Sequence, residues 1–258
     1  MNTLHLTSSQ LVSRIDLVLD GEAYTAEVFG DEHHGRQQVR CAKPHRMIAA
    51  LYVQERGCYV NLHGVDAWPQ SRDARLYAGP WPVVGHPPCE RWGNYWYGGP
   101  SVPQERRQTL GDDGGCFAAC LTSVRQWGGL LEHPAGSRAW SAHGLPEPTR
   151  GGWFADMFGG WSCEVEQGHF GHRARKPTWL YAVGCTLPSL PWGRSKSTVR
   201  AEVREDETRT RGKRTRDDAI ELMCHRERLA TPVPFRDLLL SIAATVRSSH
   251  AVARAPVR

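Results

Sequence analysis

Short apolar runs separated by turn residues predict a series of β-strands in this chain. Strands buried on both faces are continuously apolar, whereas strands exposed on one face alternate between apolar and polar residues. Both patterns occur here, and the segments between them are rich in Gly, Pro and charged residues, which favour loops. Strands are expected at residues 17–19, 24–29, 48–53, 58–65, 83–85, 130–132, 161–167 and 178–183.

Local residues make some of these predictions more specific. An Asp-Gly turn dipeptide predicts a hairpin over residues 17–29, and the polar residues 31–46 predict a loop. The strand over residues 58–65 should end at Asp66. In residues 161–167 Trp, Cys and Val alternate with Ser and Glu, which predicts that the apolar side chains point inward.

Helical spacing of apolar residues is found in three segments. Residues 117–127 follow the helix-start pair Asp112-Asp113 and precede a Gly-Gly pair, so they predict a helix with both ends marked. Residues 217–229 and 234–246 predict two further helices, the last with a proline in its first turn.

Two predicted strands end at residues that can carry chemistry. The run Val83-Val84-Gly85 is followed by His86, two prolines and Cys89, and the run before Glu132 is also apolar. A helix is predicted between them, so the order is strand, helix, strand. If the strands are parallel neighbours, Cys89 and Glu132 emerge together at the carboxyl edge of the sheet, where open α/β sheets bind ligands.

This order of elements predicts an α/β fold with a Rossmann-like, mostly parallel sheet, flanking helices and a basic C-terminal helical appendage. For a chain of 258 residues we expect an α/β catalytic domain over residues 1–190. Residues 191–216 are expected to form a basic linker, and residues 217–258 a helical segment.

Charge and composition narrow the class of partner. The formal net charge is +5, and residues 194–228 are dense in Arg and Lys, which suits a polyanion such as nucleic acid; a solvated linker with offsetting Asp and Glu is the alternative. No signal peptide and no run near the roughly 18 apolar residues of a membrane span is visible, so we expect a cytoplasmic protein without membrane contact. The eight cysteines are expected to be reduced, and their spacing predicts no metal site.

Cys89 and Glu132 together suit one reaction class. A cysteine between a strand end and an aromatic, Gly-rich loop is accessible as a nucleophile, and a glutamate can bind a ring nitrogen or transfer a proton. The pair fits conjugate addition to carbon 6 of a pyrimidine, which makes carbon 5 nucleophilic. His86 is a candidate for raising the thiolate fraction of Cys89, and Trp92 for stacking on an extruded base. The alternative is structural, with Cys89 and Trp92 packed in the core and Glu132 in a surface ion pair.

The same residues resemble a known family. Residues 87–89 (Pro-Pro-Cys) resemble the Pro-Cys nucleophile motif of cytosine-5 DNA methyltransferases, and residues 132–134 (Glu-His-Pro) resemble their Glu-Asn-Val segment. Residues 167–176 are similar to the segment that carries the arginine pair of the family, with Arg173 and Arg175 at the matching spacing. The resemblance covers roughly residues 60–185.

The resemblance implies that Cys89 is the nucleophile, that Glu132 holds the pyrimidine and that Arg173 or Arg175 lies near DNA. It also implies S-adenosylmethionine as cofactor, although no Gly-rich loop for it precedes Cys58; after its predicted strand, Asp66 is the candidate contact. A bacteriophage DNA-modification protein that acts in the host cytoplasm and evades restriction is expected.

Two alternatives stay open. One is an amino acid transferase that joins an amine to an activated 5-hydroxymethyluracil in phage DNA and needs no methyl donor. The other is a DNA-binding or anti-restriction protein without catalytic activity.

Overall fold

The computed structural model divides the chain into two compact units, Met1–Met47 and Ile48–Arg258. The expectation of one α/β domain over residues 1–190 is therefore wrong at its start, because the strands before Ile48 pair among themselves. The predicted linker and the helix expected over residues 217–229 lie almost wholly outside the described residues. Described are the backbone of residues 10–19, 22–30 and 37–42, and residues 47–149, 151–196, 227 and 229–246 in full.

The first unit contains a three-stranded antiparallel sheet in the order β1-β2-β3. Its strands are β1 (Gln10–Leu19), β2 (Glu22–Gly30) and β3 (Gln37–Ala42). The β1-β2 hairpin confirms the predicted turn, with Leu19 paired to Glu22. The loop predicted over residues 31–46 is wrong, because β3 pairs with β2 through its backbone although its sequence is largely polar.

The second unit is built on a seven-stranded sheet in the order β5-β4-β6-β7-β10-β9-β8. Within the described residues, β5, β4, β6 and β7 pair in parallel, and β7, β10, β9 and β8 pair antiparallel. The α/β character is as expected, but the sheet is mixed rather than mostly parallel. Its strands are β4 (Ile48–Val53), β5 (Val65–Pro69), β6 (Val83–Gly85), β7 (Gly129–Pro134), β8 (Phe154–Ala155), β9 (Gly160–Glu166) and β10 (Pro177–Val183).

The predicted strand-helix-strand unit is present as β6, α1 (Cys116–Trp127) and β7, and the two strands are parallel neighbours. The Asp113 carboxylate accepts the N–H groups of Gly115 and Phe117, which satisfies donors at the start of α1. At the start of β7, a side chain in place of Gly129 would collide with the backbone of Val83. Glycine therefore permits the close approach of β7 to β6.

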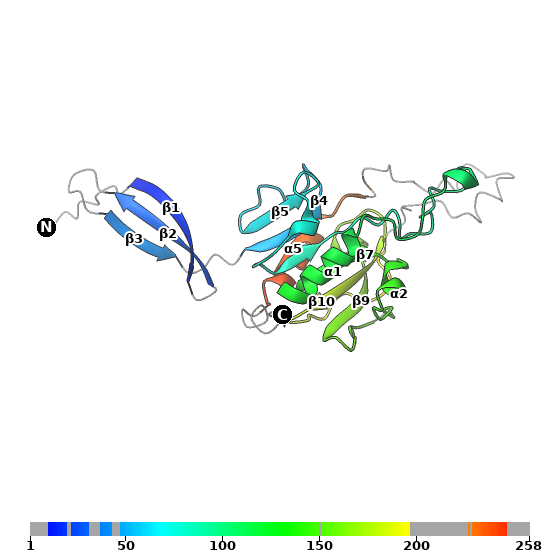
Figure 1. Cartoon of the computed structure of the whole chain (residues 1–258). Helices are drawn as coiled ribbons and strands as arrows, with labels where there is room; N and C mark the ends of the chain where they lie inside the picture. The colour runs from blue at the N-terminus through cyan, green and yellow to red at the C-terminus, as the bar shows by residue number, and fades with distance from the viewer. Residues whose placement is uncertain are drawn as a thin grey trace, which may run out of the picture. The chain divides into compact units, whose positions relative to one another are not determined.

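Helices cover both faces of this sheet (Figure 1). On one face α1 packs Phe117 and Val124 into a core with Leu51 and Leu131. On the other face α5 (Val233–Ala243) packs against the alternate residues of the same strands. The predicted C-terminal appendage is thus wrong for α5, because its apolar face completes the second half of the core: Phe235, Leu239, Ile242 and Ala243 with Ala50, Val84, Leu130 and Leu180.

Two strand predictions need correction. Residues 58–64 form turns, with Asn61 and Gly64 at positive φ, so no strand ends at Asp66; it is the second residue of β5. In β9 the predicted alternation fails at its start, since Trp161 is 40% exposed and Ser162 is buried. The Trp140 indole N–H donates to the Ser162 hydroxyl, which stabilises the buried polar group.

The remaining described elements are short. They are α2 (Ala139–Ala142) and the 3₁₀ turns η1 (Ala74–Leu76), η2 (Gln104–Arg106) and η3 (Gln167–Phe170). The loop predicted over residues 90–103 is confirmed as irregular structure. Cysteines with described side chains are unbridged, and among the described residues no helix is long and apolar enough to cross a membrane.

Candidate active site

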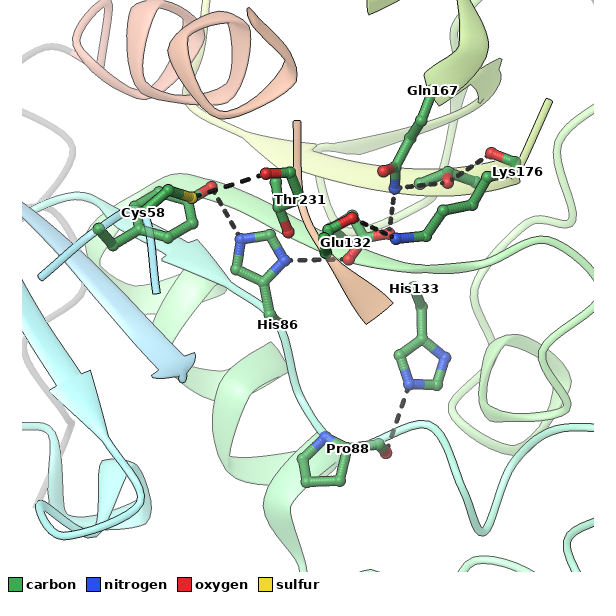
Figure 2. A network of polar contacts seen from close by, with 11 residues as sticks. Cys58, His86, Pro88, Glu132, His133, Gln167, Lys176 and Thr231 are labelled. Carbon is green, nitrogen blue, oxygen red and sulfur yellow. Dashed lines mark hydrogen bonds and ion pairs between the residues drawn. The ribbon is translucent and has the colours of Figure 1, made fainter. Parts of the chain in front are cut away.

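His86 and Glu132 lie side by side where the parallel strands β6 and β7 separate. The last paired residues are Gly85 and Leu131, so the next residue of each strand meets the other. The Nδ1 atom of His86 is 2.9 Å from Oε2 of Glu132, and each side chain is 13% exposed (Figure 2). Only β6 ends here: β7 continues to Pro134 along β10, so the prediction that its strand ends at Glu132 is wrong, and Glu132 lies where β7 loses β6 as a neighbour.

Tyr59 fixes the orientation of the His86 ring. Its hydroxyl is 2.9 Å from Nε2 of His86, and the residue is 3% exposed. Burial, together with the negative charge of Glu132, raises the pKa of Tyr59 well above its ordinary value, so the phenol keeps its proton. Because the Glu132 carboxylate can only accept, Nδ1 of His86 donates to its Oε2 atom, while the Tyr59 hydroxyl engages Nε2 on the other side of the ring.

Gln167 binds the other oxygen of the carboxylate. Its Nε2 atom donates to Oε1 of Glu132 at 3.2 Å and to Oγ1 of Thr178 at 3.0 Å. The Thr178 hydroxyl in turn donates to the Lys176 carbonyl at 3.1 Å. Gln167 is 1% exposed, and its Oε1 atom has no hydrogen-bond partner among the described residues. The Glu132 carboxylate is thus held on one side by His86, which follows β6, and on the other by Gln167 of η3, which Thr178 of β10 positions.

Lys176 brings a cation to the same place. Its side chain extends toward Glu132, and Nζ donates to the Ala230 carbonyl at 3.1 Å (Figure 2). Burial lowers the pKa of Lys176, while the charges of Glu132 and Cys89 oppose that fall. The backbone of Lys176 has φ 44°, a left-handed conformation that costs a non-glycine residue about 1–3 kcal/mol. Such strain is found where the surrounding structure holds a side chain in a required position.

The Glu132 carboxyl is ionised at neutral pH. Burial alone would raise its pKa, but the His86 hydrogen bond and the positive charges of His86 and Lys176 outweigh burial and lower the pKa. A buried carboxylate with these partners can accept further hydrogen bonds but cannot donate one.

Cys89 lies three residues after His86 in the chain and is partly buried. Burial and the negative charge of Glu132 raise the pKa of its thiol, and Lys176 partly offsets them. Cys89, Glu132 and Lys176 therefore interact electrostatically, as the residues of one site would. With its pKa raised, Cys89 is a thiol at neutral pH.

His133 connects the cysteine loop to strand β7. Its Nδ1 atom accepts the Ser137 hydroxyl at 2.7 Å, and Nε2 donates to the Pro88 carbonyl at 3.4 Å. The residue is 1% exposed, and burial lowers its pKa to about 4, so the ring is neutral. Because Pro88 immediately precedes Cys89, His133 fixes the backbone next to this cysteine.

The residues predicted from sequence do not all meet here. His86 and Glu132 are in contact and Glu132 acts electrostatically on Cys89, whereas Arg173 is about half exposed and pairs with Glu227 at 3.0 Å. Arg175 is partly buried, its carbonyl accepts the Gly168 N–H, and its role near DNA stays a prediction. Of this basic segment, it is Lys176 whose charge acts on the carboxylate and the thiol.

Trp92 is a core residue in this structure. It is 6% exposed, packs against Phe117 and His143, and donates its indole N–H to Asp113 at 2.8 Å. Its face is therefore occupied by protein, and this placement does not support the predicted stacking on a base. The loop that carries Trp92 is anchored to the start of α1 instead.

Asp66 does not fit the expected role in binding S-adenosylmethionine. Its carboxylate already accepts Arg72 Nη1 at 2.6 Å and the Trp68 indole N–H at 2.8 Å. It also lies near the beginning of β5, one residue from its start, whereas a ribose contact is expected after a strand end. No step of the chemistry is therefore derived through this cofactor. Among the described residues, no group of three or more His, Cys, Asp or Glu side chains could hold a metal ion.

Sequence reasoning missed four residues of the site: Tyr59, His133, Gln167 and Lys176. The last two bound the segment that resembles the arginine motif, but nothing in their identity distinguishes them from Arg173. Tyr59 lies in residues 58–65, for which a strand was predicted. His133 was noted only because it follows Glu132 in the sequence. Comparisons of the chain with protein-family models, with curated proteins and with solved structures found no match.

Proposed function

We propose that this protein is a transferase that modifies a pyrimidine base in DNA at carbon 5. Cys89 is the nucleophile and Glu132 binds the ring. The observation that carries the proposal is the contact of His86 with the ionised carboxylate of Glu132 where β6 and β7 separate, together with the electrostatic interaction of this carboxylate with the Cys89 thiol and the Lys176 ammonium group. Open α/β sheets bind their substrates at this edge, and these groups have complementary chemistry.

The first step is addition across the 5,6 double bond. Cys89 loses its proton to solvent, and the thiolate forms a bond to carbon 6. The π electrons move toward carbon 5 and onto the oxygen at position 4 of a uracil or the ring nitrogen N3 of a cytosine, which becomes negatively charged. Carbon 5 can then take an electrophile; loss of the carbon 5 proton to a base and cleavage of the sulfur-carbon bond restore the ring and the thiol.

The surrounding residues position the two reacting groups. His86 and Gln167 hold the two oxygens of Glu132, so the carboxylate is preorganised before a ring arrives. His133 holds the Pro88 carbonyl and with it the loop that ends in Cys89. Positive charge at Lys176 stabilises both the thiolate and the negative charge that develops on the ring.

The group transferred to carbon 5 is a separate question. Transfer of a methyl group, and attack of an amine on an activated 5-hydroxymethyl group, both begin with the addition at carbon 6. DNA as the partner is supported by the basic residues 194–228, which are dense in Arg and Lys.

Exchange of the hydrogen at carbon 5 tests the proposal without a donor. The full chain is incubated in D₂O with single-stranded oligonucleotides that contain deoxycytidine and deoxyuridine, and the nucleosides are analysed by mass spectrometry. Addition of Cys89 followed by reversal should replace the carbon 5 hydrogen by deuterium. The expected result is a mass increase of one pyrimidine that is lost in Cys89→Ser.

Cys185→Ser is the matched control. Cys185 is also a partly buried, unbridged cysteine, but its Sγ atom contacts the Gly129 carbonyl, at the opposite end of β7 from Glu132. This variant should exchange deuterium as the wild type does. If no pyrimidine gains deuterium, or if Cys89→Ser exchanges as well as the wild type, the proposal is wrong, and a DNA-binding role without catalysis is then favoured.

A further inference from the structure

We infer that the site binds a pyrimidine of the uracil and thymine class, whose N3–H lies between two ring carbonyls, in preference to cytosine, and that Lys176 binds one of those carbonyls. This inference rests on the proposed function and names the substrate class of the same site. The supporting observation is the arrangement of hydrogen-bond donors and acceptors around Glu132.

The carboxylate of Glu132 offers acceptors in one fixed orientation. Each of its oxygens already accepts one N–H, from His86 at 2.9 Å and from Gln167 at 3.2 Å. A carboxylate oxygen can accept two hydrogen bonds, so each retains one free acceptor position. Both neighbouring side chains point donors at Glu132, so neither brings an acceptor that would stabilise a proton on it.

Lys176 supplies donors beside those acceptors. Its ammonium group has three N–H bonds, and the Ala230 carbonyl takes one at 3.1 Å. The other two can bind an oxygen next to Glu132. The left-handed backbone of Lys176, φ 44°, is a conformation that its side chain alone would not select, and it directs Nζ to this position.

The two classes of pyrimidine present opposite edges to this arrangement. Uracil and thymine present N3–H, a donor, flanked by two carbonyl acceptors. Cytosine presents N3 as an acceptor, with an amino group on one side. An ionised carboxylate accepts N3–H of the first class, and the ammonium group binds the adjacent carbonyl, whereas the N3 lone pair of cytosine faces the carboxylate without a proton between them.

The charges around Glu132 keep it ionised. Burial alone would raise its pKa, but the net effect of its partners is to lower it, so cytosine would have to bring or recruit a proton. The titratable groups that interact with Glu132 come from four segments of the chain: Tyr59, His86, Cys89, His133 and Lys176.

Paired oligonucleotides that differ at one base test the inference. One carries a single deoxyuridine and the other a single deoxycytidine at the same position, and the full chain is assayed with each for deuterium exchange and for equilibrium binding by fluorescence anisotropy. We expect exchange at deoxyuridine to exceed exchange at deoxycytidine by about tenfold or more at pH 8, because a misplaced buried acceptor loses a hydrogen bond. The ratio should fall as the pH is lowered toward 6, since a proton then becomes available to cytosine.

Two variants test the residues. Glu132→Gln replaces one acceptor by an N–H donor that matches N3 of cytosine, so the binding preference should shift toward deoxycytidine by about tenfold. Lys176→Met should reduce exchange at deoxyuridine by about tenfold or more. Glu164→Gln is the control, because this glutamate of β9 binds the Trp179 indole N–H at 3.0 Å instead of the site.

The outcomes separate the two proposals. Cys89-dependent exchange that is equal or faster at deoxycytidine overturns the inference and leaves the proposed function standing. An unchanged base preference in Glu132→Gln also overturns it. Absence of Cys89-dependent exchange on either oligonucleotide overturns the proposed function and the inference together.

Discussion

We expect the wild-type protein to lose stability in mild acid, and we expect that replacement of His133 removes most of this loss. The ring is 1% exposed and its pKa is lowered to about 4 by burial, against an ordinary value of 6.5. Between these values the unfolded chain binds a proton at this side chain and the folded protein does not. The free energy of unfolding contributed by the neutral ring is therefore fully present above pH 6.5 and falls as the pH is lowered toward 4.

The size of the effect follows from the two pKa values. With one site at 6.5 in the unfolded chain and at about 4 in the folded protein, lowering the pH from 7.5 to 5 costs about 2 kcal/mol of unfolding free energy. His133→Gln and His133→Asn do not titrate and should lack this contribution. Gln keeps a donor for the Pro88 carbonyl, and Asn keeps an acceptor for the Ser137 hydroxyl.

Urea denaturation followed by tryptophan fluorescence measures the difference. Wild type and both variants are unfolded at pH 7.5 and at pH 5, and the change between the two pH values is compared. Burial also lowers the pKa of His143, but that residue is present in all three proteins and cancels. The pKa of Glu132 is lowered from an ordinary 4.5, so the stability that this carboxyl contributes changes only at pH values below the range compared here. If the variants lose as much stability as the wild type, within about 0.5 kcal/mol, the neutral buried state of His133 is refuted.

Three further predictions follow from the site and its surroundings. Because the charge of Glu132 raises the pKa of the Cys89 thiol, Glu132→Gln should speed alkylation of Cys89 by iodoacetamide at pH 8 by about threefold or more, measured by peptide mass spectrometry; an unchanged rate contradicts the coupling. Trp92→Ala should lower the free energy of unfolding by about 3–5 kcal/mol in urea, because it empties a buried position; lost DNA affinity at unchanged stability would instead support base stacking. Arg173→Ala should change stability by less than about 1 kcal/mol, since its ion pair is exposed, and a fall in oligonucleotide affinity of this variant would support the predicted DNA contact.

The centre of the sheet could be predicted because its pattern is local. The apolar runs before His86 and Glu132 are bounded by Gly and Pro, and the helix between them has both ends marked, so their order and direction follow from the sequence. Parallel strands joined by one helix then bring the two strand ends together. The same reasoning predicted that Cys89 and Glu132 lie near one another, and Glu132 does act electrostatically on Cys89; their shared catalytic role stays a prediction.

The edges of the fold were harder to predict because pairing there overrides composition. β3 is a largely polar strand that forms because its backbone pairs with β2, and the side chains of β3 give no sign of this pairing. Residues 58–64 are apolar enough for a strand, but positive φ values at Asn61 and Gly64 turn the chain. The exposed position of Trp161 depends on the register of β9 with β10.

The rest of the site could not be predicted because it is assembled from distant segments. Gln167 reaches Glu132 across 35 positions, and Tyr59 reaches His86 across 27. Three basic residues, Arg173, Arg175 and Lys176, stand within four positions, and nothing in their identity indicates that Lys176, at φ 44°, is the one whose charge acts on Glu132.

The hydrogen bond from Lys176 to the Ala230 carbonyl can form only late in the synthesis of the chain on the ribosome. The site side chains from Tyr59 to Lys176 are synthesised first, but the acceptor of the Lys176 ammonium follows 54 positions later. α5, which closes the second half of the core, comes later still. A nascent chain that has not reached Ala230 thus lacks the contact that fixes the Lys176 ammonium group, and the candidate site is completed late in synthesis.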